Sequence, residues 1–389
     1  MIGKIKTAFF MPDMIIGGTE NVFIRTLEEL LKDDSFDLSV FLLEPLKEKF
    51  YTDWFGINPN IKLHIVYPAA NRFRWRGILN FFPIKNIRKI SWSIYKKIMR
   101  RRLKRDMAIK DFDIVIDYKN FSCIKELKHA RCAKITWIHG GIDFFNRHFG
   151  ERQIREYDRI VCLSDSFLRD FQSTHKSGRE KIVRIYNPID IGGIKKLSRE
   201  LPAFPGKYFL SVSRLAADKD IETIIRAFDI FLRHEQCPEV KLLIVGDGKL
   251  RGKLERLAQS THIKNNIIFT GSVSRPFGYM RGAMAHILSS RAEGLPTVMV
   301  ESAVCGTLNI ASDCKSGVAE ILMDGDAGIL FKPGDAERLA EIMSDILHER
   351  PDAQKLIGNA AGRLERFDSK AIIMQVKNLL ADVMKNTGQ

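Results

Sequence analysis

Two glutamates give the clearest chemical signal in this 389-residue sequence. Glu293 stands in Glu-Gly-Leu-Pro, and Glu301 follows eight residues later inside an expected helix of mostly apolar residues. A carboxylate among apolar neighbours needs hydrogen-bond donors, because burying it unpaired is costly. Hydroxyl groups of a sugar or a ribose would supply such donors. The alternative is a structural carboxylate that pairs with backbone amides or with a lysine or arginine.

Two cations and a pair of glycines also follow expected strands. Arg214 and Lys219 lie five residues apart and could neutralise a diphosphate, or they could be solvated surface charges. Gly17 and Gly18 open an expected helix, where backbone amides could approach a phosphate. They could equally form a plain tight turn, and the G-x-G-x-x-G pattern of dinucleotide-binding proteins is missing. These positions are therefore candidates for a phosphate-bearing ligand.

A histidine and the cysteines complete the reactive residue types. His139 precedes Gly140-Gly141 after a strand, and from the residues alone such a histidine is more often structural than a ligand contact. No Asp-x-Asp stands at a strand end and no His/Cys cluster has metal-ligand spacing, so we expect no metal site. The six cysteines never form C-x-x-C, which favours small buried side chains in a reducing compartment.

The elements that must position these residues alternate along the whole chain. Short apolar runs alternate with helical patterns, which is typical of βαβ units around a mostly parallel sheet. The first series of strands is expected at 6–11, 38–43, 62–66, 113–117, 134–138 and 159–163, with a helix at 20–32. The second series is expected at 208–212, 241–245, 267–270, 286–288 and 308–311, with helices at 221–233, 249–261, 296–305 and 336–348.

The pattern predicts an α/β protein with two Rossmann-like, doubly wound domains. We expect a first domain at residues 1–190 and a second at 191–366, with a C-terminal helix at 367–389 that could pack back on the first domain. The glycines and prolines of 187–205 are typical of a linker. Ligands of open parallel sheets bind at the carboxyl ends of the strands. The candidate residues should therefore meet in a cleft between the domains.

The positive charge is concentrated in one segment. The chain has a formal net charge of +15, and residues 71–110 hold 14 lysines and arginines against one acid, Asp106. One interpretation is an interfacial helix on anionic lipid, with a membrane-facing set made of Trp75, Lys89, Trp92, Lys96, Arg100, Arg101 and Lys104. The alternatives are a surface helix whose isoleucines face the core, and a nucleic-acid-binding segment, for which no known module is present.

No segment is long and apolar enough to span a membrane, and Pro12 and Asp13 interrupt the first apolar run. We therefore expect a cytoplasmic protein that associates peripherally with the inner face of the cytoplasmic membrane.

The assembled motifs resemble the family 4 glycosyltransferases, which have the GT-B fold. The resemblance covers nearly the whole chain and is densest between residues 208 and 332. It is carried by GGTE (17–20), YNPID (186–190), SVSRLAADKD (211–220), LLIVGDGKLRGKL (242–254), IIFTGSV (267–273), SSRAEGLPTVMVESAVCG (289–306) and SDCKSGVAEILMDGDAGIL (312–330). Ser213, Ser302 and the run Thr307-Leu308-Asn309 depart from the family pattern, which bears on the identity of the donor more than on the fold.

The resemblance implies that residues 1–190 bind the acceptor and residues 191–366 bind the nucleotide sugar, and it implies roles for individual positions. The residues that it places at a nucleotide-sugar donor are Gly17, Gly18, Arg214, Lys219, Val273, Glu293, Gly294, Leu295, Pro296 and Glu301. Arg214 and Lys219 match the pair that binds the donor pyrophosphate, Glu293 matches the acid that contacts the donor sugar, and Glu301 the acid that holds the ribose. His139 matches a histidine near the donor sugar. Glu293, His139, Arg214 and Lys219 are therefore the expected catalytic set.

The function implied is a retaining, metal-independent transfer without a protein nucleophile or cofactor. The donor would be a nucleotide sugar, most often a UDP-sugar, that carries a hexose or N-acetylhexosamine. The acceptor would be a membrane-anchored glycan such as lipopolysaccharide core, O-antigen or a polyprenyl-linked saccharide. The alternatives are a GT-B-fold epimerase, and a non-catalytic membrane- or nucleic-acid-binding protein with a degenerate cleft.

Overall fold

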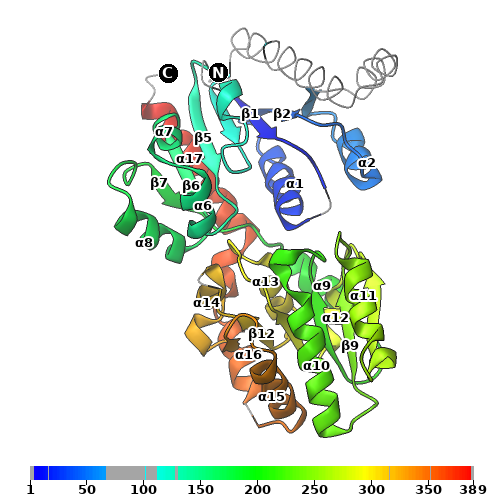
Figure 1. The fold of residues 1–389 in the computed structure, drawn as a ribbon. Coiled ribbons are helices and arrows are strands. Elements are labelled where there is room, and N and C mark those ends of the chain that lie inside the picture. The colour runs from blue at the N-terminus through cyan, green and yellow to red at the C-terminus, as the bar shows by residue number, and fades with distance from the viewer. Residues whose placement is uncertain are drawn as a thin grey trace, which may run out of the picture.

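The computed structural model describes residues 4–15, 17–66, 101, 112–127, 130–314, 316–350 and 352–386. Within these residues the chain forms two parallel sheets, one in each half of the molecule (Figure 1). This arrangement confirms the predicted pair of doubly wound α/β domains. No helix in this described part is both long and apolar enough to cross a membrane.

The first sheet has seven parallel strands among the described residues, in the order β3-β2-β1-β4-β5-β6-β7. They are β1 (Ile5–Met11), β2 (Phe36–Leu42), β3 (Lys62–Ile65), β4 (Ile114–Asp117), β5 (Ala133–Trp137), β6 (Arg159–Cys162) and β7 (Ile182–Arg184). β4 is buried along its whole length, as a strand covered by helices on both faces requires. The strand order reverses between β1 and β4, so the loops that follow these two strands border a crevice suited to a ligand.

The second sheet has six parallel strands within the described chain, in the order β10-β9-β8-β11-β12-β13. They are β8 (Tyr208–Val212), β9 (Lys241–Val245), β10 (Ile267–Gly271), β11 (Ala285–Leu288), β12 (Asn309–Ser312) and β13 (Ile329–Phe331). Here the order reverses between β8 and β11. The loops after these strands carry Lys219 and Glu293, so the topology alone brings the two motifs together.

Helices cover both sheets. Around the first sheet lie α1 (Gly18–Leu31), α2 (Lys49–Ile57), α5 (Ile124–Leu127), α6 (Ile142–His148), α7 (Glu151–Arg155) and α8 (Asp165–Thr174). The second half adds α9 (Ile191–Glu200), α10 (Ile221–Glu235), α11 (Arg251–Gln259), α12 (Phe277–Gly282), α13 (Thr297–Val304), α14 (Gly317–Ile321), α15 (Ala336–Leu347), α16 (Ala353–Ala361) and α17 (Ser369–Asn386). Short 3-10 turns are η1 (Ala217–Lys219), η2 (Lys264–Asn266), η3 (Met323–Gly325) and η4 (Leu364–Phe367).

Three elements differ from the sequence prediction. The first series does not end at residue 163, because the short strand β7 adds to its edge, and β13 extends the second sheet. The expected linker contains α9, even though Gly192 and Gly193 lie in its first turn. Asp190 caps this helix by accepting a hydrogen bond from the Gly193 amide at 2.9 Å. The cap and the packing of α9 against α12 and α13 offset the poor helix propensity of two glycines.

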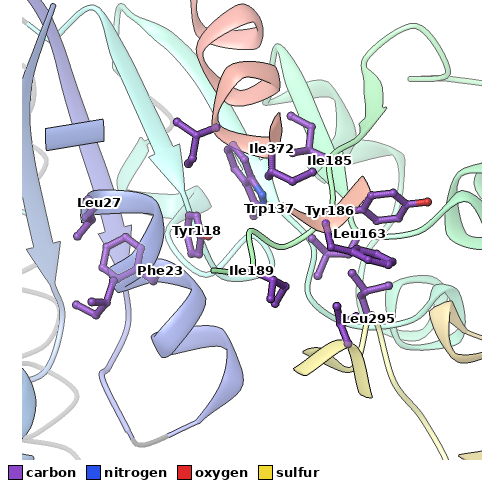
Figure 2. Packing of buried hydrophobic residues seen from close by; sticks show 14 of the residues in the cluster. Phe23, Leu27, Tyr118, Trp137, Leu163, Ile185, Tyr186, Ile189, Leu295 and Ile372 are labelled. Atoms are coloured by element: carbon purple, nitrogen blue, oxygen red, sulfur yellow. The ribbon is translucent and has the colours of Figure 1, made fainter. Parts of the chain in front are cut away.

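One hydrophobic cluster runs through both halves of the molecule. It contains Phe23, Tyr118 and Trp137 of the first half, together with Leu295 of the second (Figure 2). The chain also crosses back at its end, because α17 forms ion pairs from Lys377 to Asp33 at 2.6 Å and from Asp382 to Arg159 at 2.8 Å. The boundary at residues 190 and 191 stays a prediction, but the change from one sheet to the other lies between β7 and β8.

Candidate active site

An ion pair between Lys219 and Glu293 lies at the carboxyl edge of the second sheet. Lys219 Nζ is 2.5 Å from Glu293 Oε1, and the two side chains are only 14 % and 10 % exposed. The same carboxylate oxygen accepts a hydrogen bond from the Ser290 hydroxyl at 2.6 Å. Two candidates from separate motifs therefore share one site, with little water to screen their charges.

Hydrogen bonds and a second ion pair connect the two loops that carry Lys219 and Glu293. The Ser289 hydroxyl lies 2.9 Å from the carbonyl oxygens of both Lys219 and Asp220. The Arg291 amide donates to the Asp218 carbonyl at 2.8 Å, and the Arg291 guanidinium pairs with Asp220 at 2.7 Å. Sequence reasoning missed Ser289, Asp220 and Arg291. The only local signal was their position within the stretches 211–220 and 289–306 that carry the resemblance, because their role depends on contacts between distant loops.

Arg214 lies on the same edge but does not join the pair. Its side chain is 59 % exposed, and its nearest charged partner is Asp218 at 3.7 Å. An exposed guanidinium on a short loop can turn toward an incoming anion at small cost. Its geometry therefore agrees with a ligand-binding role as well as with a surface ion pair.

Glu301 lies on α13 and faces the other half of the molecule. Burial raises the pKa of Glu301 above its usual range, against the opposing effect of the positive charge of Arg25 on α1. Arg25 also donates a hydrogen bond to the carbonyl of Pro188 at 3.0 Å. A half-buried carboxylate in this setting gains from hydroxyl donors that a ligand would bring.

His139 meets the Glu293 loop across the domain interface. A Cβ atom added to Gly294 would lie 2.3 Å from the His139 carbonyl oxygen, and one added to Gly141 would lie 2.9 Å from the carbonyl oxygen of Glu293. These contacts are closer than any side chain permits, so glycine is required at both positions. The structure thus places the predicted histidine directly beside the predicted acid.

Gly17 and Gly18 lie at the start of α1, where the first half of the molecule approaches α13. Gly17 is the N-cap residue of α1. A Cβ atom on Gly17 would lie 2.8 Å from Glu20 Oε2, whereas one on Gly18 would lie 3.7 Å from the Thr297 hydroxyl of α13. The glycine turn therefore borders the same interface as Glu301.

A charged cluster that the sequence did not single out lies next to this turn. Lys119, in the loop after β4, pairs with Asp13 at 2.8 Å and with Glu20 at 3.0 Å. Glu20 is nearly buried, with a side chain 7 % exposed, and Lys119 is its cationic partner. The three residues come from the loops after β1 and β4 and from α1, and no single motif contains all three, although Glu20 ends GGTE (17–20). Their association follows from the strand order.

The remaining donor-site predictions differ in what they can offer a ligand. Leu295 and Pro296 are buried, and Leu295 is part of the core, so the backbone of this segment rather than its side chains is available. Val273 lies two residues beyond the end of β10 and is half-buried against the same core. All of these positions lie after strands of the second sheet.

A cavity of about 310 Å³ opens elsewhere on the domain interface and contains none of the predicted site residues. Its lining includes Asp165 of α8 and Glu320 of α14. The Tyr186 hydroxyl lies between two carboxylates, 3.2 Å from Asp165 and within hydrogen-bond distance of Glu320, and its single proton is shared between them. The Asp165 amide donates to Glu320 at 2.8 Å. These hydrogen bonds connect the two halves of the molecule.

Among the residues that the structure describes, no cluster of three or more histidines, cysteines or acids has metal-binding geometry. Of the predicted membrane-facing set, only Arg101 is described, as an exposed residue. The other six lie outside the described residues: Trp75, Lys89, Trp92, Lys96, Arg100 and Lys104.

Comparison with protein families gives two adjacent matches. Residues 16–192 match the family described as Glycosyltransferase Family 4, and residues 195–363 match the one described as Glycosyl transferases group 1. Together they cover both halves of the molecule and every predicted donor-site position.

Similar individual proteins span nearly the whole chain. An N-acetylgalactosaminyltransferase of Campylobacter jejuni, named for an acceptor glycan on diphospho-undecaprenol, is 29 % identical over 97 % of this chain and 99 % of its own. The structure of Anabaena HepE in complex with UDP-glucose has a TM-score of 0.72 at 19 % identity, covering 97 % of this chain and 99 % of that one. The lipopolysaccharide outer core galactosyltransferase WaaB has a TM-score of 0.69 at 18 % identity, with coverage of 97 % and 99 %.

Proposed function

The chain belongs to the group 1 and family 4 glycosyltransferases, a retaining and metal-independent class that uses nucleotide sugars, and from this premise we propose its donor and acceptor. The donor is a UDP-sugar that carries a hexose or an N-acetylhexosamine. The acceptor is a membrane-anchored glycan such as lipopolysaccharide core, O-antigen or a polyprenyl-linked saccharide. The observation that carries the proposal is the Lys219–Glu293 pair, held beside His139 in the interface between the domains.

The second domain binds the donor in this proposal. Glu301 accepts hydrogen bonds from the ribose hydroxyls, and Lys219 and Arg214 neutralise the diphosphate. Glu293 and the backbone of residues 294–296 contact the sugar. The buried Lys219 is already oriented by Glu293, so little reorganisation is needed when negative charge develops on the leaving group.

The transfer itself needs no protein nucleophile. The bond between the anomeric carbon and the diphosphate oxygen breaks, and the acceptor hydroxyl oxygen forms the new bond on the same face of the sugar. The acceptor proton passes to the leaving diphosphate, whose charge the two cations stabilise. The apolar contacts around Leu295 keep water from this region, which protects the donor from hydrolysis.

The acceptor side of the proposal rests on the first domain and on the relatives. Residues 71–110 carry a net charge of +13 (14 cations minus one anion), which suits an anionic membrane surface. On α2 the large apolar residues Phe50 and Ile57 are 55 % and 78 % exposed. The relative from Campylobacter jejuni is named for a lipid-linked acceptor, and WaaB for lipopolysaccharide. We therefore place the enzyme at the inner face of the cytoplasmic membrane.

Thermal-shift measurements with UDP, GDP, ADP and CMP and their common sugars test the donor assignment. A nucleotide at 100 times its Kd should stabilise the protein by about 2.7 kcal/mol. We expect a shift with UDP and its sugar that is lost in Glu301→Ala. A shift with another nucleotide alone would overturn the assignment of UDP, and no shift with any would overturn the donor site.

The acceptor is tested by transfer from the identified donor to undecaprenyl-diphosphate-linked saccharides and to truncated lipopolysaccharide, with the free reducing oligosaccharides as controls. Transfer to the lipid-linked forms alone is the expected result. Equal transfer to the free oligosaccharides would contradict a membrane-anchored acceptor, and interconversion of donor sugars without any acceptor would indicate an epimerase.

A further inference from the structure

The loop that follows β4 holds His139 through two separate hydrogen bonds. The Asn120 side-chain oxygen accepts from the His139 amide at 2.8 Å. The His139 ring nitrogen Nε2 lies 2.9 Å from the carbonyl oxygen of Tyr118. Both the backbone and the ring of His139 are therefore positioned by residues 118 and 120, which belong to a different βα unit.

We infer that Asn120 is a positioning residue that acts on His139 through this loop. It keeps His139 as the tautomer that is protonated on Nε2. Nδ1 then accepts a hydrogen bond from a hydroxyl group of the donor sugar. The inference rests on the proposed function for the identity of the ligand. The tautomer itself follows from the protein alone. It goes beyond the predicted proximity of His139 to the donor, because it assigns the direction of the hydrogen bond, which the Tyr118 carbonyl sets, and the residue that holds His139 against this carbonyl.

The tautomer follows from the chemistry of the partner. A carbonyl oxygen has lone pairs and no proton, so Nε2 must be the donor in the contact with Tyr118. Burial lowers the pKa of His139 to about 4, and the nearby charge of Lys119 acts in the same direction. The ring is thus neutral near pH 7, and a neutral imidazole protonated on Nε2 has a free lone pair on Nδ1. It accepts a hydrogen bond there and cannot donate one.

The backbone of the loop explains why asparagine stands at position 120. Asn120 and Phe121 both have φ of +55°, a left-handed conformation that asparagine tolerates better than most residues. The Asn120 amide donates to the Trp137 carbonyl at 2.9 Å, which ties the loop to the end of β5. At the end of β4, directly before the loop, the buried carboxylate of Asp117 accepts hydrogen bonds from the Cys123 amide at 2.7 Å and from the Tyr157 hydroxyl at 2.8 Å. The turn is therefore fixed on both sides.

The position of His139 gives this tautomer a use. The His139 carbonyl is packed against Gly294, and the neighbouring Gly141 is packed against the carbonyl of Glu293. The histidine therefore lies next to the loop that the proposed function assigns to the donor sugar. A sugar presents several hydroxyls, and a hydroxyl both donates and accepts. An acceptor on the protein selects the orientation in which the hydroxyl proton points to His139.

Long-range proton–nitrogen NMR of the ligand-free protein tests the tautomer. His139 is assigned by the loss of its signals in His139→Gln. We expect the protonated pattern on Nε2 and the unprotonated pattern on Nδ1. The opposite assignment, or a doubly protonated ring at pH 7, would overturn the inference. This measurement requires no substrate, so it stands even if the proposed function fails.

Two variants at position 120 isolate the side-chain oxygen. Asn120→Gly keeps the left-handed backbone accessible but removes the oxygen, whereas Asn120→Asp keeps an oxygen acceptor. Gln236→Gly, at an exposed position with φ of +52°, is the matched control for a glycine at such a site. We expect Asn120→Gly to give mixed tautomers of His139, and we expect Asn120→Asp and Gln236→Gly to keep the wild-type pattern.

Kinetics then connect the tautomer to the sugar. With the donor identified above, we expect Asn120→Gly to lower kcat/KM about tenfold, the effect of losing one oriented hydrogen bond. The thermal shift by the nucleoside diphosphate alone should not change, because that ligand has no sugar. An Asn120→Gly enzyme within twofold of wild type, an equal loss of nucleoside diphosphate binding, or an Asn120→Asp as impaired as Asn120→Gly would each overturn the assigned role.

Discussion

Replacing Lys219 by methionine tests whether the ion pair at the proposed donor site is a structural as well as a functional unit. Methionine keeps much of the aliphatic volume and removes the charge. Glu293 would then stay 90 % covered, and the Ser290 hydroxyl would still donate a hydrogen bond to it. Removing one partner of a buried pair costs about 3–5 kcal/mol. Because Ser290 remains, we expect a loss near the lower end, about 3 kcal/mol in the free energy of unfolding.

A double-mutant cycle with Glu293→Gln separates the pair from its surroundings. Glutamine can still accept from Ser290 but needs no cation, so Lys219→Met together with Glu293→Gln should recover most of the lost stability. We expect a coupling free energy of about 2–3 kcal/mol, measured by urea unfolding followed by circular dichroism. The matched control is Arg338→Met with Glu341→Gln, an ion pair of 2.7 Å whose side chains are 50 % and 64 % exposed. Its coupling should stay below about 0.5 kcal/mol.

The double variant should recover stability but not catalytic activity. All three variants at Lys219 and Glu293 should transfer sugar slowly. The variants without the lysine should lose about 2.7–4 kcal/mol of transition-state stabilisation, or roughly 100- to 1000-fold in kcat. Release of the nucleoside diphosphate is the assay. A double variant no more stable than Lys219→Met alone, or a coupling as small as that of Arg338 and Glu341, would refute the argument that burial makes this pair strong.

Three further perturbations follow from the interface between the domains. Gly294→Ala would place a Cβ atom 2.3 Å from the His139 carbonyl oxygen, so kcat should fall more than about tenfold. The control is Gly358→Ala, whose added Cβ atom would have no neighbour within 4 Å, and this variant should leave kcat unchanged. Donor affinity, measured by calorimetry between pH 4.5 and 8, should weaken as pH falls through the raised pKa of Glu301, because protons compete with ribose hydroxyls for the carboxylate. Glu301→Gln should bind the donor weakly at every pH. A wild-type affinity that stays constant across this range would contradict the assignment of Glu301 to the ribose. Tyr186→Phe removes the hydroxyl whose proton is shared by one carboxylate in each half, so urea unfolding should show a loss of about 1.5–3 kcal/mol. An unchanged midpoint would show that these contacts do not stabilise the interface.

Local patterns in the sequence were enough for the class of fold and for most strands. Apolar runs of three to seven residues separated by helical patterns are typical of a parallel sheet that helices cover on both faces. The order and spacing of seven short stretches, from GGTE (17–20) to 312–330, also identified the family that the comparisons match. Local patterns did not predict α9, because two glycines at its start resemble a linker, and a cap plus tertiary packing outweighs them.

Only the tertiary structure decided which candidates share a site. Glu293 pairs with Lys219 although 74 residues separate them, and Lys119 lies 106 residues from Asp13. The Asn120 side chain reaches His139 from the loop of a neighbouring strand. None of these contacts has a signature in the sequence, because a side chain's partners depend on strand order and on how the two domains meet. The sequence by itself therefore determined the elements and the chemistry at their ends. The path of the chain through space determined which of those ends meet, and that depends on packing interactions summed over the whole molecule.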